Sequence, residues 1–378
     1  MEIIEARIWP MQAVLHHPIR VSFGEMRKRP GFLLSLKDKS GLTGWGESWV
    51  NFPPWGPAER TMVLSYLLKE IVGQEIHPGD IPTLYARYLL QVIQWGGIGP
   101  YSQAVSAVEC ALWDLEAKRK SVPLYELLQP SNLDNVHRVS VYGSGIDPSN
   151  LEQRITDALS AGFQEVKIKI GFDSQQDRNH FKSAVKMVGD GNVMVDANQA
   201  WDRTTAGHEL SFYTESGAGW IEEPISAYDT EGYRIITEKY DSVASGENWY
   251  VPTVPAVSSI KLRVLQPDLC KVGGVWAAKS MILHGPRTIT GVAFHVLGLP
   301  VSHAFALHVA AAWKDVVTKV EIDTNENPLS DTMIGDWSIK NGQATLGARH
   351  GLGIEVDEEK LASFVLPELH RFCTVSAE

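Results

Sequence analysis

Three carboxylates in the middle of the chain follow three short apolar segments at almost equal spacing. They are Asp196, Glu222 and Glu247, which lie 26 and 25 residues apart. Each apolar segment is rich in strand-forming residues, and each acid is followed by enough residues for a helix, so the spacing is that of one strand plus one helix. We therefore predict that the acids lie at the ends of three successive parallel strands, on the face of a barrel where active sites form.

Other ionisable residues continue the same period in both directions. Lys169 precedes the three acids, and Asp268, His295 and Glu321 follow them, at intervals of 21 to 27 residues. One charged residue at a strand end is common and usually marks where the strand meets solvent. Seven in one phase predict that a base, a histidine and five acids converge at one mouth of the barrel.

The three central acids have the chemistry of a metal site. Three oxygen ligands, with no cysteine or histidine among them, disfavour zinc and favour Mg²⁺, with Mn²⁺ possible, completed by water and substrate. Without a cation, three neighbouring carboxylates would repel and raise one another's pKa. The alternative is that each acid caps the following helix or pairs with a surface lysine, which is the better interpretation for any single acid but not for all three together.

The flanking residues could serve as two bases on opposite sides of that cation. A lysine next to a cation has a lowered pKa and can act as a neutral base, which fits Lys169. A histidine backed by an acid is held in one tautomer, which fits His295 with Asp268. Such a site suits a carboxylate substrate whose α-hydrogen is removed while charge moves onto the carboxylate oxygens. The outcome is either proton transfer between faces or loss of a β-hydroxyl.

Composition is that of a globular enzyme rather than a nucleic-acid or membrane protein. The chain has 378 residues, 44% hydrophobic and 21% charged, which is enough for a barrel of about 250 residues plus a further domain. A net charge of −11 argues against nucleic-acid binding. Cys110, Cys270 and Cys373 are few and far apart, so we expect free thiols in a reducing compartment. The beginning of the chain lacks a basic and apolar leader, and no apolar run reaches 18 residues, so we expect a cytoplasmic protein without a membrane partner.

The elements that must position these residues form an α/β fold with two parts. Residues 1–125 show strands followed by helices, which predicts an α+β capping domain, and residues 126–325 show the repeating pattern of a modified TIM barrel, (β/α)7β, opened by a strand at 138–142. Residues 326–378 are expected to complete the barrel and pack on the capping domain, with 351–356 returning to that domain as a strand. In the first part, the expected strands are 3–9, 32–36 and 42–47 and the expected helices are 57–73, 80–94 and 101–120.

Short motifs surround these residues in the barrel part: Lys167-Ile168-Lys169, Asp196-Ala197-Asn198, Glu222-Glu223-Pro224, Gly246-Glu247-Asn248 and the segment from Pro267 to Gly274. These motifs resemble the enolase superfamily, and within it the mandelate racemase subgroup, whose members are mandelate racemase/muconate lactonizing enzyme-like proteins. The likeness also includes Gly44 to Glu47 and Ala111 to Lys118 in the first domain, and the tail from Gly351, so it spans nearly the whole chain.

This resemblance implies a role for each site residue. Asp196, Glu222 and Glu247 would be the metal ligands, Lys169 one base, and His295 with Asp268 the other. The substrate carboxylate would be held or polarised by Lys167, Asn198 and Glu321.

The implied chemistry is Mg²⁺-dependent abstraction of the α-proton of a small carboxylate through an enediolate intermediate. Dehydration of an acid sugar or related hydroxy acid is the leading expectation. A racemase or epimerase of a 2-substituted carboxylic acid is the alternative, and a non-catalytic binding protein of the same fold is more remote. A homo-oligomer is also expected.

Two other histidines compete with His295. The segment from His284 to Thr290 departs from the apolar helix end expected before the seventh strand, which leaves the register of His295 open, and His303 could be the catalytic imidazole instead. His308 lies in an apolar helical run, where a core histidine is the better interpretation.

Substrate specificity is expected from two loops of the first domain. Residues 21–30 carry Arg27, Lys28 and Arg29, which could bind a distal carboxylate or hydroxyls, or could form a solvated loop. Residues 49–55 carry Phe52 and Trp55, which could exclude water as a lid or pack between the domains.

Overall fold

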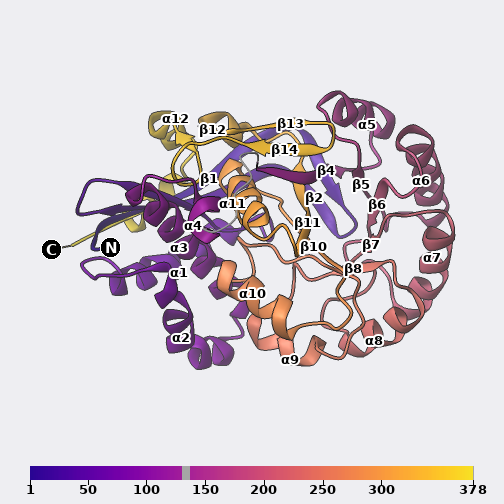
Figure 1. The fold of residues 1–378 in the computed structure, drawn as a ribbon, viewed down its shortest axis with the longest axis horizontal. Helices are drawn as coiled ribbons and strands as arrows, with labels where there is room; N and C mark the ends of the chain where they lie inside the picture. The colour runs from indigo at the N-terminus through magenta and orange to yellow at the C-terminus, as the bar shows by residue number, and fades with distance from the viewer. Residues whose placement is uncertain (130–136, 378) are drawn as a thin grey trace.

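The computed structural model describes residues 1–129 and 137–377. Figure 1 shows a barrel with helices around its outside, and a capping domain beside it that also holds both chain termini. This arrangement confirms the predicted fold class, a modified TIM barrel with an N-terminal α+β cap.

The capping domain is built on one antiparallel sheet, whose strand order is β16-β1-β2-β3. The sequence predicts short first and second strands, but the structure has a long hairpin whose tip is Ser22–Phe23. Residues 24–30, expected in a loop, therefore belong to its second strand. The prolines in this stretch hid the strand pattern, which the structure accommodates with a shift of register between Val14 and Ile19. The strands are β1 (Ile3–Val21), β2 (Gly24–Asp38), β3 (Thr43–Glu47) and β16 (Thr374–Ser376).

The cap helices lie against this sheet, and the longest of them packs directly on β3. Gly44 and Gly46 allow this close approach, because a Cβ at either position would collide with a backbone carbonyl of α3, at Ala111 or Ala107. The first predicted helix is shorter than expected, since it ends at Leu67 in a 3₁₀ turn. The helices are α1 (Gly56–Leu67), α2 (Ile81–Trp95), α3 (Ile98–Arg119) and α4 (Leu124–Leu128).

Eight parallel strands, β4 to β11, form the barrel in the described part of the chain, and β11 closes it by pairing with β4. Each of the first seven is followed by a helix, so the (β/α)7β pattern predicted from the sequence is present. The strands are β4 (Arg138–Ile146), β5 (Val166–Lys169), β6 (Val193–Asp196), β7 (Ile221–Glu222), β8 (Val243–Ser245), β9 (Val264–Leu265), β10 (Gly291–Phe294) and β11 (Val317–Asp323). The helices are α5 (Leu151–Ser160), α6 (Ser174–Val188), α7 (Arg203–Glu215), α8 (Thr230–Lys239), α9 (Val254–Val257), α10 (Val275–His284) and α11 (Pro300–Ala312).

Three barrel helices begin with an aspartate that caps them. Asp173, Asp202 and Asp229 each accept a hydrogen bond from the backbone N–H three residues later, at the start of α6, α7 and α8. Such a cap satisfies a backbone donor that the helix itself leaves unpaired, and it stabilises the helix by about 1 kcal/mol. These caps fix where each helix starts after the strand that carries a site residue.

Two later barrel helices, α10 and α11, are capped instead by acids of the capping domain. Glu47, at the end of β3, accepts hydrogen bonds from the backbone N–H groups of Leu299 (2.7 Å) and Ser302 (2.8 Å) at the start of α11. Glu109, in α3, does the same for Val275 (2.5 Å) and Trp276 (3.3 Å) at the start of α10. Neither helix has a capping side chain of its own. The two buried carboxylates therefore dock the cap onto the barrel.

We expect one of these docking contacts to make stability pH-dependent. Burial raises the pKa of Glu109 from 4.5 to about 8, against the opposing hydrogen bonds from Trp276 and Val275. The folded state therefore keeps a proton on Glu109 that the unfolded chain releases between about pH 4.5 and 8. The contribution of Glu109 to the free energy of unfolding is complete below pH 4.5 and declines as pH rises from 4.5 to 8. Urea unfolding of wild type and Glu109→Gln should show a difference in unfolding free energy that changes by up to about 5 kcal/mol across this pH range.

The control for this experiment is Glu116→Gln, which removes a partly exposed acid from the same helix. It should keep the wild-type slope of unfolding free energy against pH. An unchanged slope in Glu109→Gln would contradict the expected effect.

The C-terminal tail contacts both domains, though not as predicted. Within 351–356, Glu355–Val356 alone forms a strand, β15, and it pairs with β12 (Met333–Ile334) rather than with the capping sheet. Gly351 forms a backbone bridge with Pro123, and the Leu352 N–H donates to the Asp114 carboxylate at 2.8 Å. The strand that joins the capping sheet is β16, whose short polar sequence gave no strand signal. The remaining elements are β13 (Trp337–Lys340) and β14 (Gln343–Leu346), which extend the sheet beyond β4, and α12 (Glu358–Ala362).

Two further features concern the predicted environment of the protein. All three cysteines are free, and two of them, Cys110 and Cys270, are buried. In the described part of the chain, no helix combines the length and the apolar character needed to cross a membrane.

Candidate active site

The predicted site residues converge at the carboxyl ends of the barrel strands. Lys169, Asp196 and Glu222 occupy adjacent register positions on β5, β6 and β7. Glu247 and Asp268 lie in the segments just after β8 and β9, His295 directly follows β10, and Glu321 lies within β11. All of these side chains are buried.

Two lysines hold the acids on one side of the site. Lys167 Nζ lies 2.6 Å from Glu222 Oε1 and 2.9 Å from Glu321 Oε1, and its exposed fraction is 0%. Lys169 Nζ lies 2.5 Å from Asp196 Oδ2. A buried ammonium is tolerated only when it is paired in this way. The Lys-x-Lys motif therefore places both cations on the same inner face of β5.

A histidine forms the opposite side. His295 Nδ1 lies 2.8 Å from Asp268 Oδ2, and His295 Nε2 lies 2.8 Å from Glu247 Oε2 and 3.9 Å from Glu321 Oε2. The Asp268 contact orients the ring, as expected from the sequence, and leaves Nε2 facing the acids. Lys271 Nζ lies 3.3 Å from the same Glu247 oxygen.

The pKa shifts follow from these contacts among the protein groups. Burial by itself lowers the pKa of Lys169, but the Asp196 carboxylate outweighs it and raises the pKa above its usual value. His295 behaves in the same way, with Glu247 and Glu321 raising its pKa well above 6.5. The sequence predicts a lowered pKa for Lys169 beside a cation, and protein groups alone shift it in the opposite direction. A cation bound among the acids would repel the Lys169 ammonium and so lower the pKa of Lys169.

The acids differ from one another in the same environment. Burial raises the pKa of Glu222 to about 7, with Lys167 lowering it and Asp196 raising it. The pKa of Glu247 is shifted well below its usual value, because His295 and Lys271 outweigh its burial. The pKa of Glu222 is therefore raised mainly by its burial and secondarily by the neighbouring Asp196 and Glu321 carboxylates.

A tight metal-sized cluster is present, but its members are not the predicted trio. Among the described residues, Glu222, His295 and Glu321 offer ligand atoms that all lie within 4.8 Å of one another. Asp196 Oδ2 lies 2.5 Å from Lys169 Nζ, and Glu247 Oε2 lies 2.8 Å from His295 Nε2. The oxygen-rich donor set still suits Mg²⁺ better than one that contains an imidazole.

Several residues that the sequence did not single out support the acids. Gln266 donates to Glu222 Oε2 at 2.5 Å, and Trp220 donates to the same oxygen at 3.3 Å. Asn198, predicted to bind the substrate carboxylate, donates to Asp196 Oδ2 at 3.0 Å. Gln266 and Lys271 both lie within a few residues of Asp268, so their positions in the sequence could have identified them as site residues. No sequence pattern pointed to Trp220.

His303 and His308 do not join this cluster. Both ring nitrogens of His303 are used by the backbone: Nδ1 lies 3.0 Å from the Leu299 carbonyl oxygen, and Nε2 accepts a hydrogen bond from the Asp323 N–H at 3.1 Å. His308 accepts one from the Tyr125 N–H, and burial lowers its pKa to about 4. Helix α10 ends at His284, and β10 begins at Gly291, so His295 directly follows the seventh strand of the barrel.

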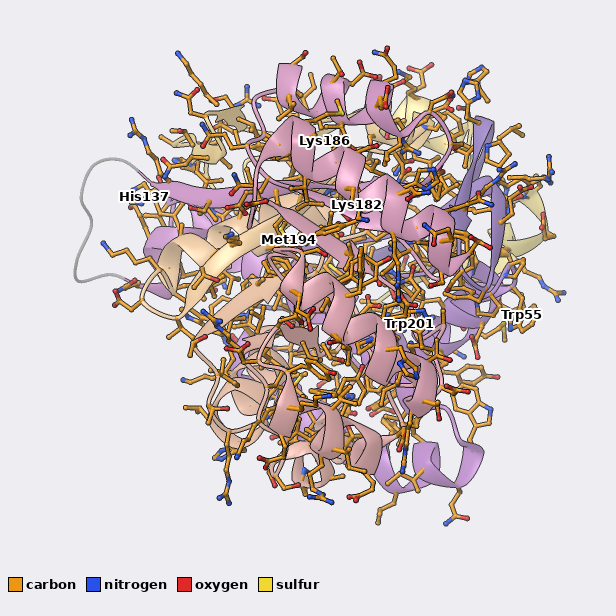
Figure 2. The ribbon with its side chains drawn as sticks, turned by 90° about the vertical axis from the view of Figure 1, so that its right-hand side faces the viewer. Trp55, His137, Lys182, Lys186, Met194 and Trp201 are labelled. Atoms are coloured by element: carbon orange, nitrogen blue, oxygen red, sulfur yellow. The ribbon has the colours of Figure 1, made fainter. Side chains whose placement is uncertain are left out.

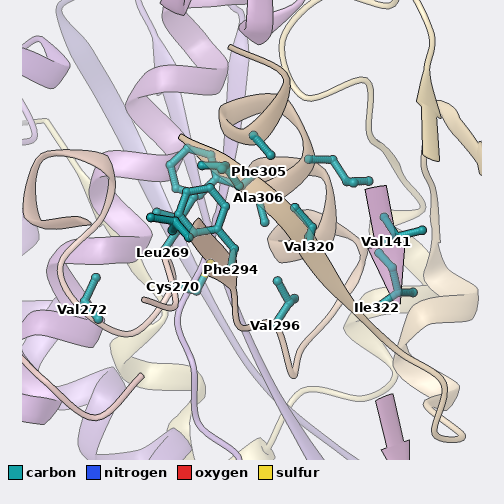
Figure 3. Close-up of a cluster of buried hydrophobic side chains, with 14 of the residues drawn as sticks. Val141, Leu269, Cys270, Val272, Phe294, Val296, Phe305, Ala306, Val320 and Ile322 are labelled. Carbon is teal, nitrogen blue, oxygen red and sulfur yellow. The ribbon is translucent and has the colours of Figure 1, made fainter. Parts of the chain in front are cut away.

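The side of β10 that faces away from His295 packs on an apolar cluster. Figure 3 shows Leu269, Cys270, Phe294 and Val296, the sequence neighbours of Asp268 and His295, among other buried hydrophobic side chains. Successive residues of a strand point to opposite sides, so packing Phe294 into the core turns His295 into the barrel. This packing explains how the ring is held where Asp268 can reach it.

The tip of the long hairpin reaches the mouth of the barrel. Ser22 Oγ donates to the carbonyl oxygens of Ala197 and Asn198 at 3.1 and 3.3 Å, beside Asp196. The Phe23 ring makes an edge contact with Phe52, with ring centroids 5.1 Å apart. The two loops predicted to cover the mouth therefore touch each other there.

The basic part of that hairpin does not form the expected cluster. Arg29 has an exposed fraction of 0% and lies 2.6 Å from Asp323, so it joins the cap to the barrel. Arg27 is exposed and pairs with Glu25 at 2.5 Å. These contacts separate two of the three cations, which excludes the interpretation as one substrate-binding cluster and leaves Arg27 with the solvated alternative. Trp55 is 65% exposed, so it is not part of an enclosed lid.

Comparisons with known proteins match both parts of the chain to two family models. Residues 3–129 match the mandelate racemase / muconate lactonizing enzyme N-terminal domain. Residues 150–360 match the enolase C-terminal domain-like model.

Individual proteins of several activities are similar to the chain over most of its length. D-galactarolactone cycloisomerase from Agrobacterium fabrum is 27% identical, over 97% of this chain and 100% of that protein. L-talarate/galactarate dehydratase from Salmonella typhimurium is 30% identical, over 76% of this chain and 71% of that protein. A racemase from Streptomyces coelicolor A3(2), solved with bound magnesium, superimposes with a TM-score of 0.82 at 24% identity, covering 96% of this chain and 100% of that one. That structural likeness shows the shared fold.

Proposed function

The chain belongs to the mandelate racemase / muconate lactonizing enzyme family of the enolase superfamily, and we propose that it is a Mg²⁺-dependent enzyme that removes the α-proton of a hydroxylated carboxylate. The observation that carries the proposal is the placement of Lys169 and the His295–Asp268 pair on opposite sides of one buried group of acids. A binding protein of the same fold would need no such pair of bases.

Each residue has a role that its position supports. Asp196, Glu222 and Glu247 would hold the cation, since each presents a carboxylate at the end of its strand. Bound Mg²⁺ would supply positive charge that polarises the substrate carboxylate and competes with Lys169 for Asp196. Lys167, Asn198 and Glu321 would hold or polarise the substrate carboxylate.

Proton transfer would be divided between the two bases. Lys169 Nζ would take the α-hydrogen from one face of the substrate, leaving an enediolate. His295 Nε2, with its ring fixed by Asp268, would return a proton on the other face or protonate a departing β-hydroxyl.

Dehydration of an acid sugar or related hydroxy acid is the outcome that we favour. The dehydratase and cycloisomerase relatives both act, by their names, on carboxylates derived from sugars. The racemase or epimerase alternative uses the same two bases and differs only in whether a β-hydroxyl leaves.

The test is a panel of acids incubated with the enzyme and Mg²⁺ in D₂O. The panel contains D-gluconate, D-galactonate, D-glucarate, galactarate, D-glucuronate and D-galacturonate. We expect at least one acid to exchange its α-hydrogen and to give a 2-keto-3-deoxy product, measured by NMR. Exchange with inversion and without such a product would favour the racemase, and no exchange with any acid would contradict the proposed function.

Domain roles, assembly and location are proposals of the same kind. The capping part, 1–125, would supply the specificity loops, the barrel part, 126–325, the chemistry, and the segment 326–378 the link between them. A homo-oligomer in the cytoplasm is the state that we propose. Size-exclusion chromatography with light scattering tests the assembly.

A further inference from the structure

Trp49 is fixed between the two domains, in the segment that joins β3 to α1. Its backbone N–H donates to the Cys270 carbonyl oxygen at 3.1 Å, which ties it to the barrel segment after Asp268. The preceding residue, Ser48, is held inside the cap, because its hydroxyl donates to the Gln103 carbonyl oxygen at 2.8 Å. The position of Trp49 over the barrel is therefore set from both sides.

The ring of Trp49 lies next to the catalytic cluster. Lys271 Nζ lies 4.3 Å from the ring centroid, within the range of a cation–π contact. The same ammonium lies 3.3 Å from Glu247 Oε2, and that oxygen lies 2.8 Å from His295 Nε2. Trp49 is thus separated from the proposed acid–base histidine by the Lys271–Glu247 pair.

The one polar atom of this side chain has no partner among the described residues. Trp49 Nε1 is buried and makes no hydrogen bond, whereas the indole N–H groups of Trp9, Trp220 and Trp249 donate to Ser35, Glu222 and Ala227. Trp276 Nε1 shares this property but lies against Tyr85 in the cap. A buried donor without a protein partner costs free energy unless water or a ligand pairs with it, and at this site a bound substrate is in a position to do so.

Two acceptors at the same site are also unpaired. Asn198 Oδ1 and Gln266 Oε1 are buried without hydrogen bonds, although the amide nitrogens of the same side chains donate to Asp196 and Glu222. A hydroxyl group can both donate and accept a hydrogen bond. A substrate with several hydroxyls could therefore satisfy Trp49 and these acceptors together.

We propose that Trp49 is a substrate-binding residue that sets specificity: its indole N–H donates to an oxygen of the substrate beyond the α-carbon, which selects hydroxylated acids. Lys271 positions the ring by its contact with the indole face. The inference rests on the proposed function, because it places the substrate among Asp196, Glu222 and Glu247.

The experiment compares wild type with Trp49→Phe, which keeps an aromatic ring over Lys271 and removes the N–H. The probes are the acid of the panel above that exchanges fastest and its analogues lacking one hydroxyl beyond the α-carbon. We expect Trp49→Phe to lower kcat/KM about tenfold for the parent acid and to have little effect with one of the deoxy analogues. Equal losses for all of the acids, or no loss, would overturn the inference.

A second measurement separates substrate binding from a structural role. Trp49→Phe should stay folded and unfold in one cooperative urea transition, as Trp55→Phe does, with a midpoint lowered only by the smaller ring. Trp55 is a comparison from the same loop, and it lies at the edge of the molecule (Figure 2). Loss of the cooperative transition in Trp49→Phe would mean that the ring is needed for the fold, and would overturn the inference. No exchange by wild type with any acid would instead defeat the proposed function, and this inference with it.

Discussion

Replacing Lys169 or His295 with alanine is expected to lower net turnover by about 10²- to 10⁴-fold, the usual contribution of a positioned acid or base. The two variants should differ in a partial reaction. If each base serves one face of the substrate, α-hydrogen exchange in D₂O survives in one variant and disappears in the other. NMR of the recovered acid measures the exchange, and the same samples give the turnover.

Two control variants make this result specific. Lys186→Ala removes a lysine from the outer helix α6 (Figure 2) and should leave both exchange and turnover unchanged. His303→Gln changes a buried histidine whose ring is held by the backbone at Leu299 and Asp323, so it should affect stability more than turnover per folded molecule. Normal turnover in His295→Ala together with lost turnover in folded His303→Gln would show that the acid–base histidine was wrongly assigned.

The barrel and the convergence of its charged residues could be predicted because their signal is periodic. A strand followed by a helix occupies about 26 residues here, and parallel strands bring their carboxyl ends to one face. The period therefore predicts that Lys169, Asp196 and Glu222 lie side by side. The register across β5, β6 and β7 shows that they do.

Contacts between segments far apart in the chain could not be predicted in this way. Glu47 and Glu109 cap helices that begin more than 160 residues later, and Arg29 pairs with Asp323, 294 residues away. Nothing local distinguishes these charges from solvated ones. The interpretation of Arg27, Lys28 and Arg29 as one substrate-facing cluster failed because Arg29 makes such a contact. Consecutive residues of a strand also point to opposite faces, so three cations in a row cannot share one face.

The pairing of individual charges inside the site was also beyond the sequence. Convergence predicts that acids and lysines meet, but which oxygen faces which nitrogen depends on side-chain packing. Lys271 is an example: its spacing from Asp268 was visible, and its contacts with Glu247 and Trp49 required the folded chain.

Replacing Glu222 with glutamine is expected to weaken Mg²⁺ binding by more than the roughly 10- to 100-fold that changes to outer partners of a metal site typically cost. The substitution removes a charged oxygen ligand and keeps the size of the side chain. Isothermal titration calorimetry of the folded variant measures the loss. Glu116→Gln, far from the cluster on α3, is the control and should bind Mg²⁺ like wild type. Wild-type affinity in Glu222→Gln would contradict a metal site at these strand ends.

Glu222 alone does not decide between two possible ligand sets, because it belongs both to the predicted trio with Asp196 and Glu247 and to the tighter cluster with His295 and Glu321. Mg²⁺ prefers oxygen ligands and rarely takes an imidazole. We therefore expect Glu247→Gln to lose Mg²⁺ affinity as severely as Glu222→Gln does, and His295→Asn to keep it within about tenfold, as a neighbour of the site would. The reverse order, with His295→Asn losing the metal and Glu247→Gln keeping it, would move the cation to the Glu222, His295 and Glu321 cluster and would leave His295 unable to serve as the second base.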